Sequence, residues 1–293
     1  MAVSRIEMRR GGMKIKVAAA QIETTSDRQQ NIAKVLALID EAARAGVKLL
    51  CFHEYSIVEC PEDRDTEEDI RKRAESIPGP FTEAVSERAR KNNLFVIPGS
   101  FFEAINGKIY NTAPLIGPDG HIIGKFSKAH PENAWAKFEI GCGITPGSGY
   151  PLFETEIGKI GLMIDMDGTV PMVPEIYSLQ SAEILCWPVN WSARWYRTIR
   201  IMAQAHGITS KCHILCSNRV GMRRHARGDL IYSGGACIVD PEGNIVAATS
   251  DFYEGLAVAE IDLDFTRRWR REVIPRDYPV RRRPETYGLI TKG

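Results

Sequence analysis

The chain has 293 residues, 44% of them hydrophobic, and a formal net charge of +1 at neutral pH. This length and apolar content allow a large buried core, in one large domain or two small ones. The nearly balanced charge excludes a global field that would attract nucleic acid or an anionic membrane. No apolar run approaches the roughly 20 residues of a membrane helix, so we expect no membrane partner.

The seven cysteines are an odd number without paired metal-ligand spacing, and most lie in apolar, strand-like runs. They favour reduced, buried thiols in a cytoplasmic protein, and we expect neither a metal nor a cofactor. Residues 1–12 are basic and contain no apolar segment long enough for a signal peptide. We therefore interpret residues 1–12 as an N-terminal extension that precedes a core starting at Met13.

The first predicted element is an apolar strand at Lys14–Ile22. Asp27 is a suitable N-cap for a helix whose apolar residues recur at helical spacing until Gly46. Another apolar strand, Val47–Phe52, follows at once. The order of strand, helix and strand predicts the first βαβ unit of the chain.

The same order recurs further along the chain. Predicted helices at 83–92 and 174–180 lead into predicted strands at 94–101 and 183–188. Such alternation is typical of an α/β protein in which helices cover a sheet.

Two predicted hairpins, 115–123 and 238–246, have nearly the same sequence pattern. Each turn carries proline at its second position and glycine at its fourth, residues that suit a type I turn. The pair suggests two similar halves, and no long linker separates them. We therefore predict one domain at 13–293, with an arginine-rich tail from 266 to 293.

Three polar residues follow predicted strands and are candidates for chemistry. Glu54 ends an apolar strand, a place that suits a buried general base, although a solvated strand-end glutamate is the common alternative. Lys128 follows the first hairpin and would stabilise an oxyanion, unless it is an ordinary loop lysine like its neighbour Lys125. Asp165 lies where a third strand runs into a tight turn, a place where enzymes expose a nucleophile.

Several short segments occur in the chain in a fixed order: Ala19–Ile22, Glu54, Tyr110–Asn111, Gly124–His130, Ile160–Gly168, Ala182–Pro188, Ser217–Gly221 and Gly235–Val246. Through these landmarks the chain resembles, from about Lys14 to Ile290, the nitrilase, or carbon-nitrogen hydrolase, superfamily. The closing segment Arg283–Ile290 resembles the end of N-carbamoyl-D-amino acid amidohydrolases. The resemblance implies a four-layer αββα sandwich that assembles as a homodimer or higher homo-oligomer.

In that superfamily the catalytic set is a glutamate, a lysine and a cysteine, with a second glutamate nearby. The resemblance implies Glu54 as the general base, Lys128 as the lysine and Glu139 as the second glutamate, with Glu132 as its rival. Asp165 stands at the cysteine position. Because an aspartate is a weak nucleophile that would have to form an anhydride, we expect thioester turnover to be lost or very slow.

The resemblance implies a hydrolase that acts on a small amide, N-carbamoyl or nitrile-like compound. Asp165 either inactivates it or serves as acid or base in a reaction without a thioester; the alternative is a catalytically dead binding or regulatory protein. Cys142 and Cys186 are conceivable substitute nucleophiles, although packing roles are favoured. Three carboxylates around one lysine must hold a proton near neutral pH, and the lysine opposes a metal ion there.

Further candidates concern the substrate and the partner subunit. Asn190, Trp191 and Trp195, together with Met166 beside the cysteine position, are predicted to bind the substrate, with core packing as the alternative. The arginines of the 266–293 tail would suit nucleic acid in isolation, but the rest of the chain balances their charge. The resemblance instead implies that this tail lies at a subunit interface.

Overall fold

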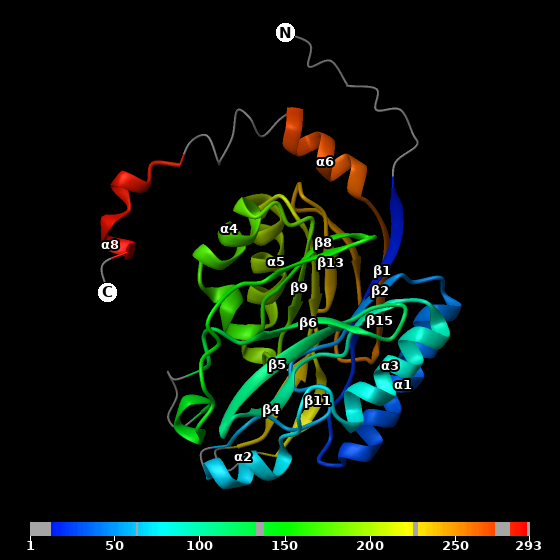
Figure 1. The fold of residues 1–293 in the computed structure, drawn as a ribbon, viewed down its shortest axis with the longest axis vertical. Helices are drawn as coiled ribbons and strands as arrows, with labels where there is room; N and C mark the ends of the chain where they lie inside the picture. Colours follow the sequence, from blue (N-terminus) through cyan, green and yellow to red (C-terminus); the bar gives the residue numbers. More distant parts are fainter. Residues whose placement is uncertain (1–12, 63, 133–137, 225–227, 273–281, 292–293) are drawn as a thin grey trace.

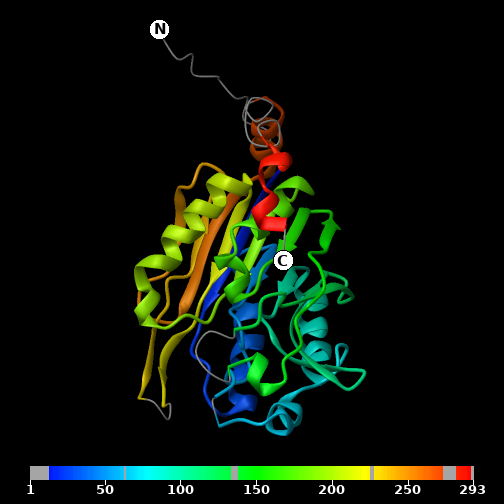
Figure 2. The same cartoon turned by 90° about the vertical axis from the view of Figure 1, so that its left-hand side faces the viewer.

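The structure is a computed structural model that describes residues 13–62, 64–132, 138–224, 228–272 and 282–291. The predicted extension at 1–12 and part of the arginine-rich tail lie outside the described residues. The four-layer arrangement is visible in two perpendicular views (Figures 1 and 2).

The first half of the chain confirms the predicted βαβ order. Asp27 caps the first helix by accepting a hydrogen bond from the Gln30 N–H at 3.0 Å, and Gly46, at φ +77°, follows its last turn. The elements are β1 (Lys14–Gln21), α1 (Arg28–Arg44), β2 (Leu49–Cys51), α2 (Glu67–Arg73), α3 (Pro80–Asn92) and β3 (Phe95–Ile97).

The first sheet has the order β15-β1-β2-β3-β5-β4, with β6 paired to β5. Its core strands β1, β2 and β3 are parallel, and the others add antiparallel partners. The predicted single strand 94–101 is wrong: Pro98 has no N–H to donate and Gly99 has φ +85°, so the chain breaks there. The added strands are β4 (Phe101–Ile105), β5 (Lys108–Ile116), β6 (Ile122–Ser127) and β15 (Gly255–Asp262).

The second half repeats this plan in a second sheet, of order β14-β13-β10-β9-β8-β7 with β8, β9 and β10 parallel. A separate ribbon pairs β11 (Val220–Arg223) with β12 (Leu230–Ser233), and α6 (Leu263–Glu272) follows β15. The remaining elements are β7 (Leu152–Thr155), β8 (Gly158–Leu162), α4 (Met172–Leu179), β9 (Ile184–Pro188), α5 (Tyr196–Ser210), β10 (His213–Ser217), β13 (Cys237–Val239) and β14 (Ile245–Ala248).

Three apolar layers hold the molecule together. Val35 and Ile39 of α1 belong to a core between the first sheet and its helices, and Val17 and Leu215 to a core between the two sheets. A third core, which includes Trp187, joins the second sheet to α4 and α5. Figure 1 shows α1 and α3 on the opposite side of the sheets from α4 and α5. The fold is therefore the four-layer αββα sandwich that the sequence predicts.

Both predicted hairpins are confirmed. The Gly120 N–H donates to Gly117 O and the Gly243 N–H to Asp240 O, each at 2.9 Å. Both closing glycines have positive φ, +83° and +88°, which a residue with a Cβ rarely adopts. One hairpin joins β5 to β6 and the other joins β13 to β14, so each sheet receives one.

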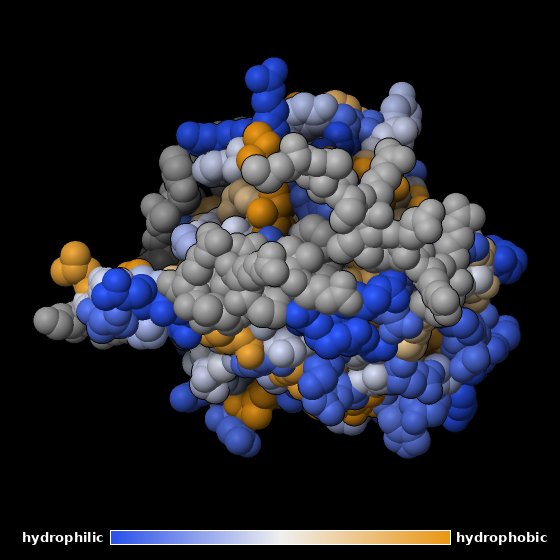
Figure 3. All heavy atoms as spheres, turned by 90° about the horizontal axis from the view of Figure 1, so that it is seen from above, coloured by the Kyte–Doolittle hydropathy of each residue, from blue (hydrophilic) through white to orange (hydrophobic). Residues whose placement is uncertain are grey.

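The exterior reflects the balanced composition. On the face seen in Figure 3, hydrophilic and hydrophobic side chains of the described residues are interspersed. Within the described ranges, no helix combines the length and apolar content needed to cross a bilayer. All seven cysteines are buried, and none of them forms a disulfide.

Candidate active site

The carboxyl ends of strands from both sheets bring Glu54, Lys128 and Asp165 together, and Glu139 joins them from the loop before a 3-10 helix. Lys128, directly after β6, places its Nζ 2.9 Å from Glu54 Oε1 and 2.7 Å from Glu139 Oε2. The same ammonium lies 3.2 Å from Asp165 Oδ2. All four residues are at most 6% exposed. The structure thus unites the four side chains that the sequence assigned to one site.

The second glutamate around Lys128 is Glu139, which precedes the 3-10 helix η1 (Ile140–Cys142). Its Oε1 accepts a hydrogen bond from the Tyr55 hydroxyl, and its Oε2 accepts one from the Glu132 N–H at 2.7 Å. The rival Glu132 therefore contributes a backbone donor to this carboxylate.

Asn111 of β5 is a site residue that the strand-end reasoning missed. Its Nδ2 donates to Glu54 Oε1 at 2.7 Å and to Glu139 Oε1 at 2.8 Å, so one amide fixes two carboxylates. The available signal was Tyr110–Asn111 as a sequence landmark and a polar side chain within an apolar strand.

Asp165 starts the 3-10 helix η2 (Asp165–Thr169) in a left-handed conformation, φ +48°. Such a φ is uncommon outside glycine and persists where the surroundings hold it. The Asn190 N–H donates to its Oδ1 at 3.1 Å, and Trp187 Nε1 donates to its backbone oxygen at 3.0 Å. Tyr55, directly after Glu54, is also left-handed, φ +56°.

Asp167, which is fully buried, joins two of the segments that carry the site. It accepts hydrogen bonds from the Ile164 N–H at 3.0 Å and the His130 N–H at 2.9 Å, and its Oδ1 lies 2.8 Å from His130 Nδ1. Because His130 follows Lys128 by two residues and Ile164 precedes Asp165, this one carboxylate sets the position of the two loops relative to each other.

The electrostatics divide the four groups into two classes. Burial, followed by the charge of Asp165, raises the pKa of Glu54 well above its ordinary value, and burial also raises the pKa of Asp165. Burial acts against ionisation of Glu139 too, but the Lys128 charge and its hydrogen bonds bring that pKa below its ordinary value. Burial alone would lower the pKa of Lys128, yet the three carboxylates raise it. Lys128 is therefore charged, Glu139 ionised, and Glu54 and Asp165 compete for a proton.

The same arrangement bears on metal binding. Within the described part of the chain, no group of three or more histidine, cysteine, aspartate or glutamate side chains has the arrangement of a metal site. The Lys128 ammonium lies where the three carboxylates converge and donates a hydrogen bond to one oxygen of each of them.

The two cysteines considered as substitute nucleophiles have other environments. Cys142 Sγ lies 3.5 Å from both Glu62 O and Asp65 O. Cys186 packs between the two sheets, where burial raises the pKa of its thiol well above the ordinary value. A buried thiol that resists ionisation is a packing residue rather than a nucleophile.

The predicted substrate-binding residues extend outward from Asp165. Asn190 contacts Asp165 through its backbone N–H, and Met166 follows Asp165 in η2, half-buried. The buried Trp191 ring lies 5.4 Å from the Trp187 ring and 5.8 Å from the Trp195 ring, centroid to centroid. Trp195 is 43% exposed, so the indoles form a continuous path from the Asp165 loop to the surface.

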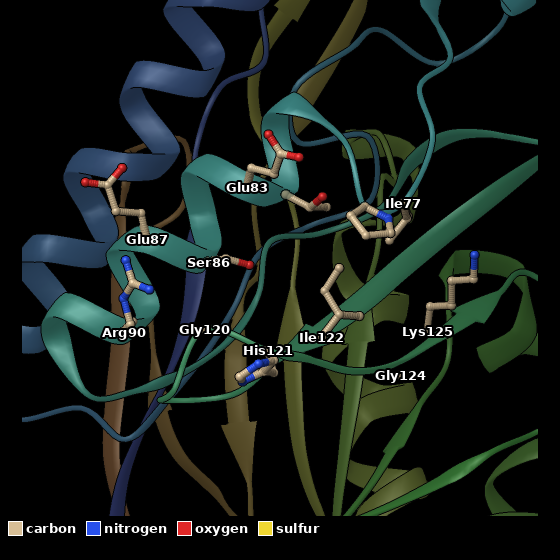
Figure 4. Close-up of a pocket in the computed structure, with 12 residues that line it drawn as sticks. Ile77, Glu83, Ser86, Glu87, Arg90, Gly120, His121, Ile122, Gly124 and Lys125 are labelled. Carbon is tan, nitrogen blue, oxygen red and sulfur yellow. The ribbon is translucent and has the colours of Figure 1, made fainter.

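A separate cavity of about 720 Å³ lies between α3 and the β5–β6 hairpin (Figure 4). Its lining includes Ser86 and Arg90 of α3 and His121 of the hairpin. Lys125 also lines it and forms an ion pair with Glu103. Lys125 therefore belongs to this cavity, whereas Lys128 belongs to the carboxylate site.

The two stacked sheets and their outer helix layers define the class of protein: the fold is that of the nitrilase superfamily. The chain matches the family model described as "Carbon-nitrogen hydrolase" over residues 16–271 and therefore belongs to that family.

Among known proteins, the chain is similar to an N-carbamoylputrescine amidase of Solanum lycopersicum, with 28% identity and 94% of each chain covered. It is also similar to an omega-amidase of Xenopus tropicalis, with 25% identity over 95% of this chain and 99% of the relative. A carbon-nitrogen hydrolase structure from Helicobacter pylori matches with a TM-score of 0.81 and 24% identity, covering 96% of this chain and 99% of the other.

Proposed function

We propose that the protein hydrolyses a carbon–nitrogen bond in a small amide, N-carbamoyl or nitrile-like compound by direct attack of water, without a thioester. The observation that carries this proposal is the Lys128 ammonium within 2.7–3.2 Å of three buried carboxylates. Burial raises the pKa of two of these carboxyl groups, Glu54 and Asp165, so one can hold a proton while the other is ionised.

The reaction uses this pair as acid and base. The positive charge of Lys128, rather than a hydrogen bond from it, polarises the carbonyl oxygen. The ionised member of the pair takes a proton from water, whose oxygen bonds to the carbonyl carbon. The protonated member then gives its proton to the leaving nitrogen as the carbon–nitrogen bond breaks. An amide and one water thereby yield a carboxylic acid and ammonia or an amine.

The relatives favour amides over nitriles as substrates. Their names describe amidases that act on N-carbamoylputrescine or on omega-amides. In a Nesterenkonia amidase of the same fold (16% identity, TM-score 0.74, covering 95% of this chain and 97% of that one), the acetamide moiety of fluoroacetamide is bound covalently to the active-site cysteine. We propose that Asp165 occupies the corresponding place, where a carboxylate favours activation of water over formation of an acyl-enzyme.

Hydrolysis of small amides in ¹⁸O-labelled water, followed over one turnover and then over several, tests this route. Direct attack by water predicts ammonia release with one ¹⁸O in the product acid and none in Asp165. Label in Asp165 after several turnovers would show instead an acyl intermediate on that side chain. Asp165→Asn should abolish ammonia release, while Asp119→Asn, in an exposed turn, serves as a matched control.

The second candidate is a protein that binds a ligand without turning it over. Two groups, Lys128 and the Asn190 N–H, donate hydrogen bonds to Asp165. This arrangement favours the second candidate, because donors bound to Asp165 do not hold a substrate oxyanion. Asp165→Cys separates the cases. Ammonia release only in the Cys variant identifies a hydrolase inactivated by Asp165, and release in neither form identifies a binding or regulatory protein.

We further propose that the protein is a cytoplasmic homo-oligomer in which the C-terminal tail contacts a second copy. Arg282 of the tail forms an ion pair with Glu175 of α4, and the described part of the tail ends in the short helix α8 (Gly288–Thr291), which is drawn apart from the sheets in Figure 1. Leu289 is 94% exposed and Ile290 61% exposed, which supports a partner surface for this helix.

A further inference from the structure

The carboxylate site has used up the hydrogen-bond donors of its central side chains. The Lys128 ammonium has three hydrogens and three carboxylate partners. The Asn111 amide has two hydrogens and donates to Glu54 and Glu139. The Tyr55 hydroxyl is also committed, to Glu139.

Acceptors, in contrast, are left over. Among the described residues, the side-chain oxygens of Asn111 and Asn190 are buried and receive no hydrogen bond. Asn111 is 1% exposed, and its amide is held in the site by Glu54 and Glu139. A buried acceptor without a donor is costly, so a ligand that supplies N–H groups would stabilise the site.

The charges of the site also favour a ligand that supplies N–H groups. Three carboxylates and one ammonium leave an excess of negative charge in a region where the side chains of Glu54, Lys128 and Glu139 are at most 3% exposed. The Asp165 side chain, 9% exposed, is the most accessible of the four. A ligand that approaches past Asp165 therefore meets a surplus of both negative charge and acceptors.

We propose that the site binds small planar nitrogen cations, of the amidinium or guanidinium class, in preference to neutral amides of the same shape. Such a cation presents several directed N–H donors, which the carboxylates of Glu54 and Asp165 and the unpaired side-chain oxygen of Asn111 can accept. Lys128 opposes a compact metal ion, but an amidinium spreads its charge over three atoms and binds through directed hydrogen bonds.

The reaction step of this inference rests on the proposed hydrolytic function. Water adds to the amidinium carbon as a carboxylate of the Glu54–Asp165 pair takes its proton. One carbon–nitrogen bond then breaks as that proton passes to the leaving nitrogen. An amidinium and one water yield an amide and ammonium, so atoms and charge balance without a further reactant.

Titration calorimetry with acetamidinium, acetamide and acetate tests the binding step, because these ligands share one skeleton and differ in charge. The whole protein should bind acetamidinium about tenfold or more tightly than acetamide, and acetate not at all. Acetamidinium binding should release protons, seen as a dependence of the apparent enthalpy on the buffer, because the cation favours ionised carboxylates over protonated ones. Asp165→Asn should remove the preference, whereas Asp119→Asn should retain it.

Equal or tighter binding of acetamide would overturn the inference, as would a preference that survives in Asp165→Asn. Ammonia measurements separate the two proposals. Preferential acetamidinium binding without ammonia release would contradict the hydrolytic function and support the binding site. Ammonia release from acetamide without any acetamidinium preference would contradict the binding site and support the hydrolytic function.

Discussion

Asp165 is held in a place that opposes its own ionisation. Burial raises its pKa, Glu139 adds to the effect, and only Lys128 and the Asn190 N–H favour the charged form. Burial also raises the pKa of Glu54, whereas Glu139, next to the same ammonium, has a lowered pKa. Stability linked to Glu139 is therefore lost as pH falls, while ionisation of Glu54 and Asp165 destabilises the fold as pH rises.

Removal of the Asp165 charge should consequently stabilise the folded protein more at neutral than at acidic pH. The native state holds a proton on the Glu54–Asp165 pair in a pH range where the unfolded chain has released it, so native stability falls as pH rises through that range. The melting temperature of Asp165→Asn, relative to the unsubstituted protein, should increase from mildly acidic to neutral pH. Each kcal/mol corresponds to about 2–4 °C in a chain of this size. A difference that is constant across this pH range would contradict the assignment.

Gly168 is a second residue with a specific steric role. A Cβ at this position would overlap the indole of Trp187, whose Nε1 supports the Asp165 backbone. Gly168→Ala should therefore lower the free energy of unfolding by about 1–3 kcal/mol and reduce turnover. Chemical denaturation of this variant beside Gly149→Ala, where a Cβ would meet nothing within 4 Å, provides the comparison. Equal stability of the two variants would count against tight packing here.

At the level of elements, the site depends on how the loop after β6 meets the loop after β8. Asp167 makes this junction, and Asp167→Asn would keep one acceptor while turning an N–H₂ toward the Ile164 or His130 N–H. The loss should be about 1–3 kcal/mol in the free energy of unfolding, since a buried donor is left unpaired. Urea denaturation measures it, with Asp119→Asn as an exposed control. A loss no larger than in that control would show that the junction does not depend on Asp167.

Elements whose signals are local could be predicted from the sequence. Asp27 and Gly46 mark both ends of α1, and the two proline-glycine turns mark the hairpins. The single strand predicted at 94–101 was wrong because apolar residues continue past the break at Pro98 and Gly99. Apolar composition alone does not show where strand pairing ends.

The residues of the site, too, could be predicted from the sequence only where a signal was available. Strand ends and the family resemblance identified Glu54, Lys128, Glu139 and Asp165. The contacts of Asn111 with Glu54 and of Tyr55 with Glu139 join residues 57 and 84 positions apart, from elements whose relative placement no local pattern encodes. Such supporting residues become visible only when the fold is known.

For the whole molecule, the C-terminal tail provides the test of assembly. Removal of residues 282–293 would delete the exposed Leu289 and Ile290 and the Arg282–Glu175 ion pair, and should lower the molar mass in solution toward that of a single chain. Light scattering coupled to size-exclusion chromatography measures this mass. As a milder variant, Leu289→Ser should weaken association in the same direction. An unchanged oligomer after truncation would place the interface elsewhere.

The central claim is that Glu54 and Asp165 share one proton beside a charged Lys128. Carbon-13 NMR of labelled aspartate and glutamate carboxyl groups, followed through a pH titration, observes that proton directly. One buried carboxyl should remain protonated well above the ordinary range of acidic side chains, and its signal should change in Asp165→Asn. If every carboxyl of the folded protein were ionised at its ordinary pH, with no difference between the protein and this variant, the acid–base account of the site would be contradicted.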